Sequence, residues 1–167
     1  MDIDARYHLL AFEHIAQLKA RYCRYIDTKQ WEALRGLFTA ATRFEGFGSA
    51  PSGADADTFV AGIRNRLGPV TSIHHCHMPE IAFTGPDSAR GIWAMMDYLQ
   101  WPAEVPKETG FFGYGHYEEE YVRTPDGWRF GFLRLTRLRM DPLPPGHVRS
   151  LPGLLAHRPD WLENGRN

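Results

Sequence analysis

Four long segments rich in β-branched and aromatic residues occupy most of residues 70–140, with short turn signals between them. These signals draw on Gly, Pro and Asp, which favour tight turns, and they lie at residues 85–87, 102–106 and 125–127. The pattern predicts four antiparallel strands, at about Val70–Phe83, Ala89–Trp101, Gly110–Arg123 and Trp128–Met140. Because several exceed the usual strand length of about 5 to 6 residues, we expect a strongly twisted and bent sheet.

Helical periodicity precedes the strands. Apolar residues recur at spacings of three and four over Leu9–Ile26, which predicts a first helix with one buried face. A shorter helix is expected at Trp31–Phe38, and a third from a cap at Asp55 or Asp57 to a stop at Gly68. Helices first and strands afterwards indicate an α+β fold, with N-terminal helices packed on a strongly curved antiparallel sheet.

The chain has 167 residues, of which 43% are hydrophobic, and this suits one domain with one core. We expect the domain to span residues 1–141. Residues 142–167 form a proline-rich tail in which regular structure is not expected, although it contains apolar side chains that need burial. These side chains are Leu151, Leu154, Leu155 and Trp161. The tail is therefore predicted to pack on the body of the protein or on a neighbouring subunit.

Charge and cysteine content exclude several classes of partner. The formal net charge is -1, with acidic and basic residues interleaved, so no basic surface for nucleic acid is predicted. No stretch of about 18 consecutive apolar residues occurs, and the first ten residues do not resemble a secretory leader. Two cysteines in a chain of this size do not suggest a disulfide framework. These features predict a cytoplasmic protein without a membrane or nucleic-acid partner.

The segment SIHHCHMPEI, residues 72–81, holds three histidines among four consecutive residues. Side chains alternate along a strand, so His74 shares one face with Cys76, while His75 and His77 share the other. A His-x-His pair binds a transition metal when further ligands arrive, and His116 and Glu118 are conceivable donors. The alternative is that His75 and His77 pack, or form hydrogen bonds, at a subunit surface.

Asp97 is unusual because it is a carboxylate among apolar residues. In the segment ARGIWAMMDYLQW it shares a strand face with apolar residues such as Trp93, Met95 and Leu99, where a carboxylate needs a partner. The adjacent antiparallel strand offers His74, and such a pair would give a base that works near neutral pH. The other interpretation is that Asp97 lies in solvent on an exposed face.

Three further residues are candidates. Tyr22 belongs to the buried stripe of the first helix. A phenol there either donates a hydrogen bond to an oxyanion or only packs in the hydrophobic core. Asp27 follows the helix end, where a carboxylate can hold a hydroxyl or a histidine in place. In the last strand, Arg137 is the arginine expected to enter a cavity, and Arg134 and Arg139 fit a charged edge.

Three motifs in order resemble one family: YCRYID at residues 22–27, SIHHCHMPE at 72–80 and WAMMD at 93–97. Together with the surrounding sequence over about residues 10–141, they resemble the SnoaL-like branch of the nuclear transport factor 2-like superfamily. Within it the chain is most similar to bile acid 7α-dehydratase and more remotely to scytalone dehydratase. The resemblance implies a cone-shaped α+β barrel, with a curved antiparallel sheet and three helices around an apolar pocket.

The resemblance also implies a catalytic set, carried over by position: Tyr22, Asp27, His74, Asp97 and Arg137. In that scheme His74 takes a proton next to a carbonyl, and Asp97 orients His74. Tyr22, helped by Asp27, forms a hydrogen bond to the enolate oxygen or to the leaving hydroxyl. Arg137 holds an anionic or polar end of the substrate. The expected substrate-binding residues are Trp93, Met95, Tyr114 and His116. No metal or cofactor is required.

The expected function is dehydration of a hydrophobic cyclic hydroxy-carbonyl compound, steroid-like or polyketide-like. The alternatives are an isomerase or cyclase that uses the same His and Asp, and a non-catalytic member that binds a small ligand or a partner protein. We also expect a homo-oligomer, dimer or trimer, because family members associate and because Trp128, Phe130 and Phe132 suggest an apolar exposed sheet face.

Overall fold

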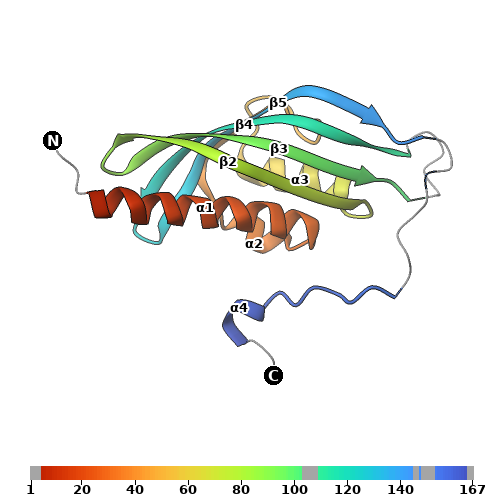
Figure 1. The fold of residues 1–167 in the computed structure, drawn as a ribbon, viewed down its shortest axis with the longest axis horizontal. Coiled ribbons are helices and arrows are strands. Elements are labelled where there is room, and N and C mark those ends of the chain that lie inside the picture. The colour runs from red at the N-terminus through yellow and green to blue at the C-terminus, as the bar shows by residue number, and fades with distance from the viewer. Residues whose placement is uncertain (1–4, 103–108, 145–146, 148–152, 165–167) are drawn as a thin grey trace.

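The computed structural model describes residues 5–102, 109–144, 147 and 153–164. Their helices and strands follow in the order α1 (Ala5–Asp27), α2 (Trp31–Arg35), β1 (Phe38–Glu45), α3 (Ala56–Leu67), β2 (Thr71–Gly85), β3 (Ser88–Gln100), β4 (Gly110–Thr124), β5 (Gly127–Pro142) and α4 (Trp161–Asn164). Helices α1 to α3 lie on one side of a long curved sheet (Figure 1). The predicted α+β class is confirmed, and so are the four long strands with boundaries shifted by a few residues.

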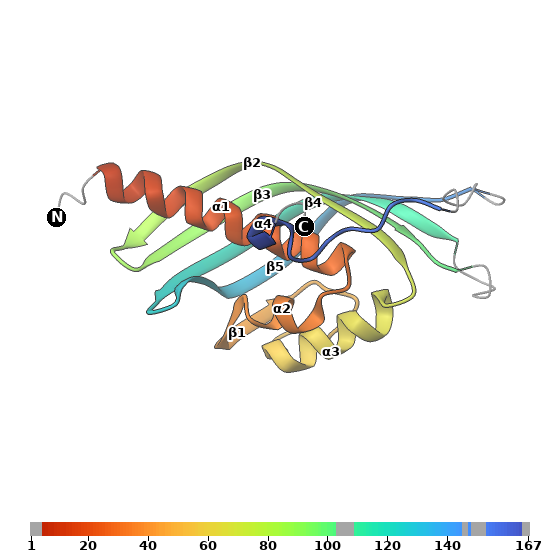
Figure 2. The same ribbon diagram turned by 90° about the horizontal axis from the view of Figure 1, so that it is seen from below.

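The sheet is mixed rather than purely antiparallel. Its strand order is β1-β5-β4-β3-β2, and β1 pairs with β5 in parallel. Strand β1 was not predicted, since Phe38 was expected to end a helix; that helix already ends at Arg35. The β-branched Thr39 and Thr42 favour the extended chain here. The sheet curls without closing, so it forms a cone-like fold and not a complete barrel (Figure 2).

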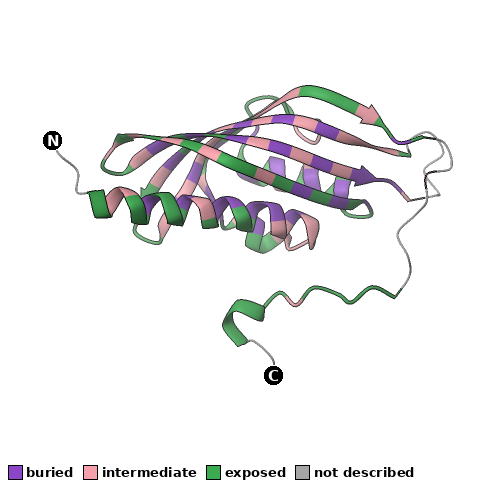
Figure 3. Ribbon diagram, viewed as in Figure 1, coloured by how far each residue is buried: buried purple, intermediate pink, exposed green. Residues whose placement is uncertain are grey.

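Strand alternation divides the sheet into two faces, and burial alternates along β3 and β4 (Figure 3). The inner face packs against α1 and α3 around a cluster of aromatic rings, in which Phe44 and Phe59 stack with centroids 3.8 Å apart. Trp128 and Phe130 belong to this buried core. The expectation that they lie on an exposed face is therefore wrong, because both follow the inward parity of β5.

The apolar stripe of α1 and the side-chain cap of α3 agree with the sequence pattern. Helix α1 buries an apolar stripe that includes Ile15, Leu18 and Tyr22. Helix α3 begins after Asp55, whose carboxylate accepts a hydrogen bond of 2.9 Å from the backbone N–H of Thr58. This side-chain cap identifies Asp55, rather than Asp57, as the residue that starts the helix.

The described part of the tail, residues 153–164, lies on the helix side of the sheet and ends in the short helix α4 (Figure 1). Its apolar residues Leu154, Leu155 and Leu162 are exposed, with Leu155 fully so. His157 lies 3.5 Å from Arg24 of α1, measured between Nε2 and Nη1. Residues 145–146, 148–152 and 165–167 of the predicted tail lie outside the described residues. None of the described helices is long and apolar enough to span a membrane.

Candidate active site

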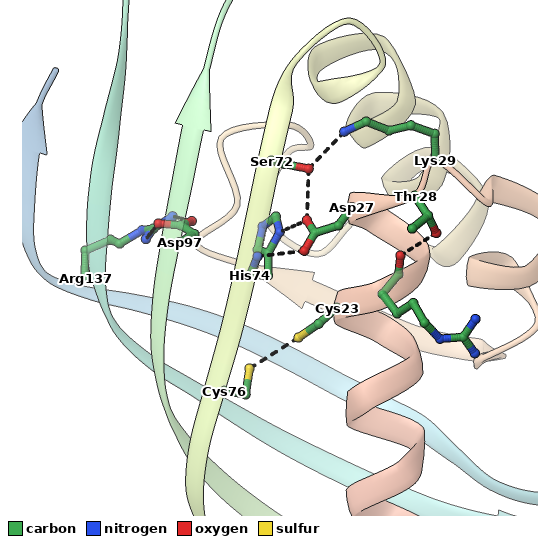
Figure 4. Close-up of polar contacts among 10 residues, drawn as sticks. Cys23, Asp27, Thr28, Lys29, Ser72, His74, Cys76, Asp97 and Arg137 are labelled. Carbon is green, nitrogen blue, oxygen red and sulfur yellow. Dashed lines mark hydrogen bonds and ion pairs between the residues drawn. The ribbon is translucent and has the colours of Figure 1, made fainter. Parts of the chain in front are cut away.

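A cavity of about 220 Å³ opens between the inner face of the sheet and the helices. Polar and charged side chains line part of it, and apolar side chains line the rest. The polar set is Tyr22, Ser49, Arg66, His74, Asp97, Tyr117 and Arg137, and the apolar set includes Phe47, Ile63, Leu67, Leu99, Phe111 and Leu135. Four of the five predicted catalytic residues therefore reach one cavity, and the fifth, Asp27, lies directly behind His74 (Figure 4).

His74 is held by Asp27, the last residue of α1. The Nδ1 atom of His74 lies 2.6 Å from Oδ1 of Asp27, and the backbone N–H of His74 donates to Oδ2 at 2.8 Å. An ionised carboxylate only accepts hydrogen bonds, so Nδ1 carries a proton, and in the neutral ring the lone pair is then on Nε2. Among the described residues Nε2 has no hydrogen-bond partner, and the ring lines the cavity. In the neutral form of the ring, this arrangement presents Nε2 as a base to a bound molecule.

Asp27 is itself fixed by further donors (Figure 4). The hydroxyl of Ser72 donates to Oδ1 of Asp27 at 2.9 Å, and Nζ of Lys29 donates to Ser72 at 2.9 Å. Lys29 adopts a left-handed φ of 62°, which turns the chain back after α1 and brings its ammonium group to β2. Partial burial lowers the pKa of Lys29. The chain Lys29–Ser72–Asp27–His74 therefore joins the end of α1 to the start of β2.

Asp97 does not orient His74, so that prediction is wrong. The two residues do stand opposite each other in the β2–β3 register, as expected. The carboxylate of Asp97 is instead engaged by the guanidinium of Arg137, which donates two hydrogen bonds of 2.8 and 2.7 Å. A planar guanidinium that binds both carboxylate oxygens is a better partner than one imidazole nitrogen. The pair is a charged, pre-organised donor group on the same inner face of the sheet, one strand away from His74.

Tyr22 and Tyr117 supply the neutral donors of the cavity. Both side chains are buried, and desolvation raises the pKa of each phenol well above its ordinary value. Their rings meet at 79° with centroids 5.8 Å apart. The phenols therefore remain protonated and suit hydrogen bonding to an oxyanion.

A buried ion pair underlies these rings. Lys19 of α1 bonds to Glu119 of β4, with both side chains essentially inaccessible, and its Nζ lies 3.3 Å from the ring centroid of Tyr117. Glu119 also accepts from the hydroxyl of Tyr121, which in turn accepts from Nε1 of Trp93 at 2.7 Å. Sequence reasoning missed this network, although a lysine on the apolar stripe of α1 was a visible signal.

The four predicted substrate-binding residues do not line the cavity. Trp93 is buried in the network just described, and Met95 is buried with its sulfur 3.6 Å from Nη1 of Arg137. Tyr114 and His116 lie on the outer face of β4, because Gly113, Gly115 and Tyr117 take the inward positions. Strict alternation would have indicated Tyr117 and Phe111 instead. Phe47 and Ser49 lie on a loop, so strand alternation could not have indicated that they line the cavity.

His75 and His77 both point outward from β2 and are exposed, with ring centroids 5.9 Å apart. The conceivable further ligand Glu118 is bound to Arg134. Within the described ranges, no group of three or more His, Cys, Asp or Glu side chains is placed to hold a metal ion. Surface packing thus describes these two histidines better than a metal site does.

Comparison with known proteins gives relatives of the same fold. The chain is 28% identical to a probable cyclase of Gibberella zeae over 74% of this chain and 89% of that protein. A crystal structure of a hexachlorocyclohexane dehydrochlorinase shares 20% identity at a TM-score of 0.75, covering 90% of this chain and all of the other. A Novosphingobium aromaticivorans protein with a scytalone dehydratase assignment shares 17% identity at a TM-score of 0.73, covering 88% and 95%.

The family model for the SnoaL-like domain matches residues 8–134, which include most of α1 and every strand of the sheet except the end of β5. The curled sheet and its helices agree with that family. The chain therefore belongs to the SnoaL-like domain family of the nuclear transport factor 2-like superfamily.

Proposed function

We propose that the protein is a cofactor-free lyase that dehydrates a compact cyclic hydroxy-carbonyl compound. The observation that carries the proposal is the hydrogen bond of 2.6 Å between Asp27 and Nδ1 of His74, which leaves Nε2 available as a base on a ring that lines the cavity. A binding protein gains little from a supported base and an ion pair in a largely apolar cavity. The likeness of the three sequence motifs to bile acid 7α-dehydratase adds support from the residues themselves.

The proposed reaction gives each of these side chains a role. Nε2 of His74 removes a proton from the carbon next to the carbonyl, and the electron pair moves onto the carbonyl oxygen. Tyr22 and Tyr117, with the guanidinium of Arg137, are the donors available to that enolate. When the enolate collapses, the hydroxyl on the adjacent carbon leaves and takes the proton from the His74 imidazolium as water. Asp27 compensates the positive charge of the intermediate imidazolium.

The size of the cavity restricts the substrate. Its volume of about 220 Å³ lies below the roughly 300–1,000 Å³ of pockets that hold drug-sized ligands. A compound with one or two rings fits this limit better than a four-ring steroid. The lining is mostly apolar with Arg66 and Arg137 as cations, so a hydrophobic ring with one anionic or polar substituent is the proposed class.

A size series of β-hydroxy ketones tests the proposal. The wild-type protein is incubated with one-ring, two-ring and four-ring members, and the absorbance of the conjugated enone product is followed. We expect turnover of the smaller members and its loss in His74→Ala, by a factor of about 10² to 10⁴ for a general base. His75→Ala is the matched control, because its side chain is on the other face of the same strand. Equal turnover in both variants would remove His74 as the base.

An isomerase or cyclase is the second candidate, and the similarity to the probable cyclase of Gibberella zeae favours it. The same base would then return its proton to another atom of the substrate, and no water would be lost. Mass spectrometry separates the two candidates, since dehydration lowers the substrate mass and isomerisation leaves it unchanged. Tight binding of the ketones without any conversion would indicate the non-catalytic alternative.

A further inference from the structure

The two cysteines of the chain face each other directly beside the base. Cys23 of α1 and Cys76 of β2 have their sulfur atoms 3.5 Å apart (Figure 4). Cys23 precedes Asp27 by about one helical turn, and Cys76 follows His74 on the same face of its strand. The same two elements are therefore joined at adjacent points, once by the Asp27–His74 pair and once by a thiol contact.

The two sulfurs are in direct contact as free thiols. A disulfide bond requires about 2.05 Å, so an approach of about 1.5 Å closes it. The segment between the two cysteines spans 53 positions and includes helices α2 and α3. A bond here would therefore link parts of the chain that are distant in sequence, and it would remove conformational freedom from the unfolded chain.

The two thiols differ in reactivity. The hydrogen bond with the thiol of Cys23 and the nearby ammonium of Lys19 lower the pKa of Cys76. The same hydrogen bond and burial raise the pKa of Cys23. Glu119 and Asp27 are the facing carboxylates, and they act against the thiolate. Cys76 is thus the sulfur that carries the nucleophilic thiolate first.

An oxidant has a route to Cys76. A surface cleft of about 400 Å³ runs between α1 and β2, and both cysteines line it. Its other walls include Ala16, Ala20 and Lys19 from the helix. Cys76 is also the more accessible of the two thiols. The small side chains of Ala16 and Ala20 line the helix side of this cleft.

We propose that Cys23 and Cys76 form a redox-sensitive modification site, in which a low-molecular-weight disulfide such as glutathione disulfide converts the thiol pair into a reversible bond between α1 and β2. The Cys76 thiolate attacks one sulfur of the oxidant and releases one glutathione thiol. Cys23 then loses its proton and attacks the Cys76 sulfur of the mixed disulfide, which releases the second thiol. Two protein thiols are oxidised and one glutathione disulfide is reduced.

Closure of this bond would add a covalent link between α1 and β2 next to the 2.6 Å contact of Asp27 with His74. We therefore expect the surroundings of the base to differ between the oxidised and the reduced protein. The oxidation itself does not depend on the proposed dehydratase reaction, and its detection needs no substrate. A failure of the proposed function and a failure of this inference are for that reason distinguishable.

The test uses the full chain in glutathione buffers of graded oxidised-to-reduced ratio. After free thiols are trapped with an alkylating reagent, intact mass spectrometry counts them and a proteolytic digest identifies linked peptides. We expect both free thiols to disappear together and a Cys23–Cys76 linked peptide to appear, without a glutathione adduct on the protein. Reduction should restore both thiols fully. The melting temperature of the oxidised form should rise, and the ring signals of His74 should shift while those of His116, on the outer face of β4, do not.

Two variants separate the steps. Cys23→Ser should accumulate the glutathione adduct at Cys76, and Cys76→Ser should leave Cys23 largely unreacted. Independent glutathione adducts on the wild-type protein, bonds between two chains, or oxidation only in denaturant would each overturn the proposal. Circular dichroism of both variants verifies folding, and the linked peptide from the wild-type protein decides the result even if one variant fails to fold.

Discussion

Asp97 in the cavity wall and Asp27 behind His74 are carboxylates with different partners, and the partner determines what each can do. Asp27 accepts from the imidazole of His74, from its backbone N–H and from Ser72, so it fixes the tautomer of the base. Asp97 is neutralised by both terminal nitrogens of Arg137. The first pair transfers a proton in the proposed reaction, and the second supplies hydrogen bonds to developing negative charge.

The buried phenols predict how stability depends on pH. Tyr22, Tyr117 and Tyr121 have raised pKa values because burial opposes ionisation, so the folded protein keeps these protons where the unfolded chain loses them. Stability is therefore fully present below about pH 10, the ordinary tyrosine value, and falls as the pH rises above it. The free energy of unfolding, measured by urea denaturation at several pH values above 10, should fall less steeply with pH for Tyr22→Phe than for the wild type. Equal slopes would contradict the assignment of the loss to these phenols.

At the scale of elements, the register of β3, β4 and β5 creates the space for the Asp97–Arg137 pair. Gly113 stands opposite Asp97 in the sheet. A Cβ atom at this position would lie 2.2 Å from Oδ1 of Asp97 and 2.2 Å from Nη1 of Arg137. The absence of a side chain at Gly113 is thus a condition for the ion pair.

This geometry predicts the effect of Gly113→Ala. The methyl group should displace both charged side chains, lower the free energy of unfolding by about 1–3 kcal/mol and reduce turnover of any substrate. Gly131→Ala is the matched control in β5, because its Cβ would lie 3.5 Å from Cγ1 of Val122 in ordinary contact. Thermal denaturation of both variants checks the prediction, and equal losses would contradict it.

The contact of α1 with β4 depends on the buried pair of Lys19 and Glu119. Removal of one partner leaves an uncompensated charge, so Lys19→Met should lower the free energy of unfolding by about 3–5 kcal/mol. The double variant Lys19→Met with Glu119→Gln should recover part of this loss, because the buried charge is then gone. Chemical denaturation of the single and double variants provides the comparison. A double variant less stable than Lys19→Met would show that the unpaired carboxylate is not the cause of the loss.

For the whole molecule, alternation and turn residues predicted four strands and three helices close to their observed positions. Strand β1 was missed because it follows α2 within a few residues and shares its apolar character. The face of His74 and Asp97 was predictable from strand parity. The true partner of His74 was not, since Asp27 and Asp97 both come within its reach and only the docking of α1 on β2 selects between them.

The outer face of the sheet predicts association of the whole molecule. Exposed apolar side chains on this face include Ile73, Ile92 and Leu138. We expect a dimer or trimer in sedimentation velocity at micromolar concentration, and Ile92→Lys with Leu138→Lys should shift it towards the monomer. Leu9→Lys, on the exposed side of α1, is the control and should leave the oligomer intact. A monomeric wild-type protein would contradict this expectation.

The tautomer of His74 tests the proposed base most directly. Nitrogen NMR of protein labelled at its histidine rings, with the His74 signals identified by their loss in His74→Gln, reports which ring nitrogen carries the proton in the neutral form. We predict a proton on Nδ1 and a bare Nε2, and we predict that Asp27→Asn alters this state while Asp97→Asn preserves it. A proton on Nε2 in the wild-type protein, or a state that follows Asp97 rather than Asp27, would contradict the proposed base.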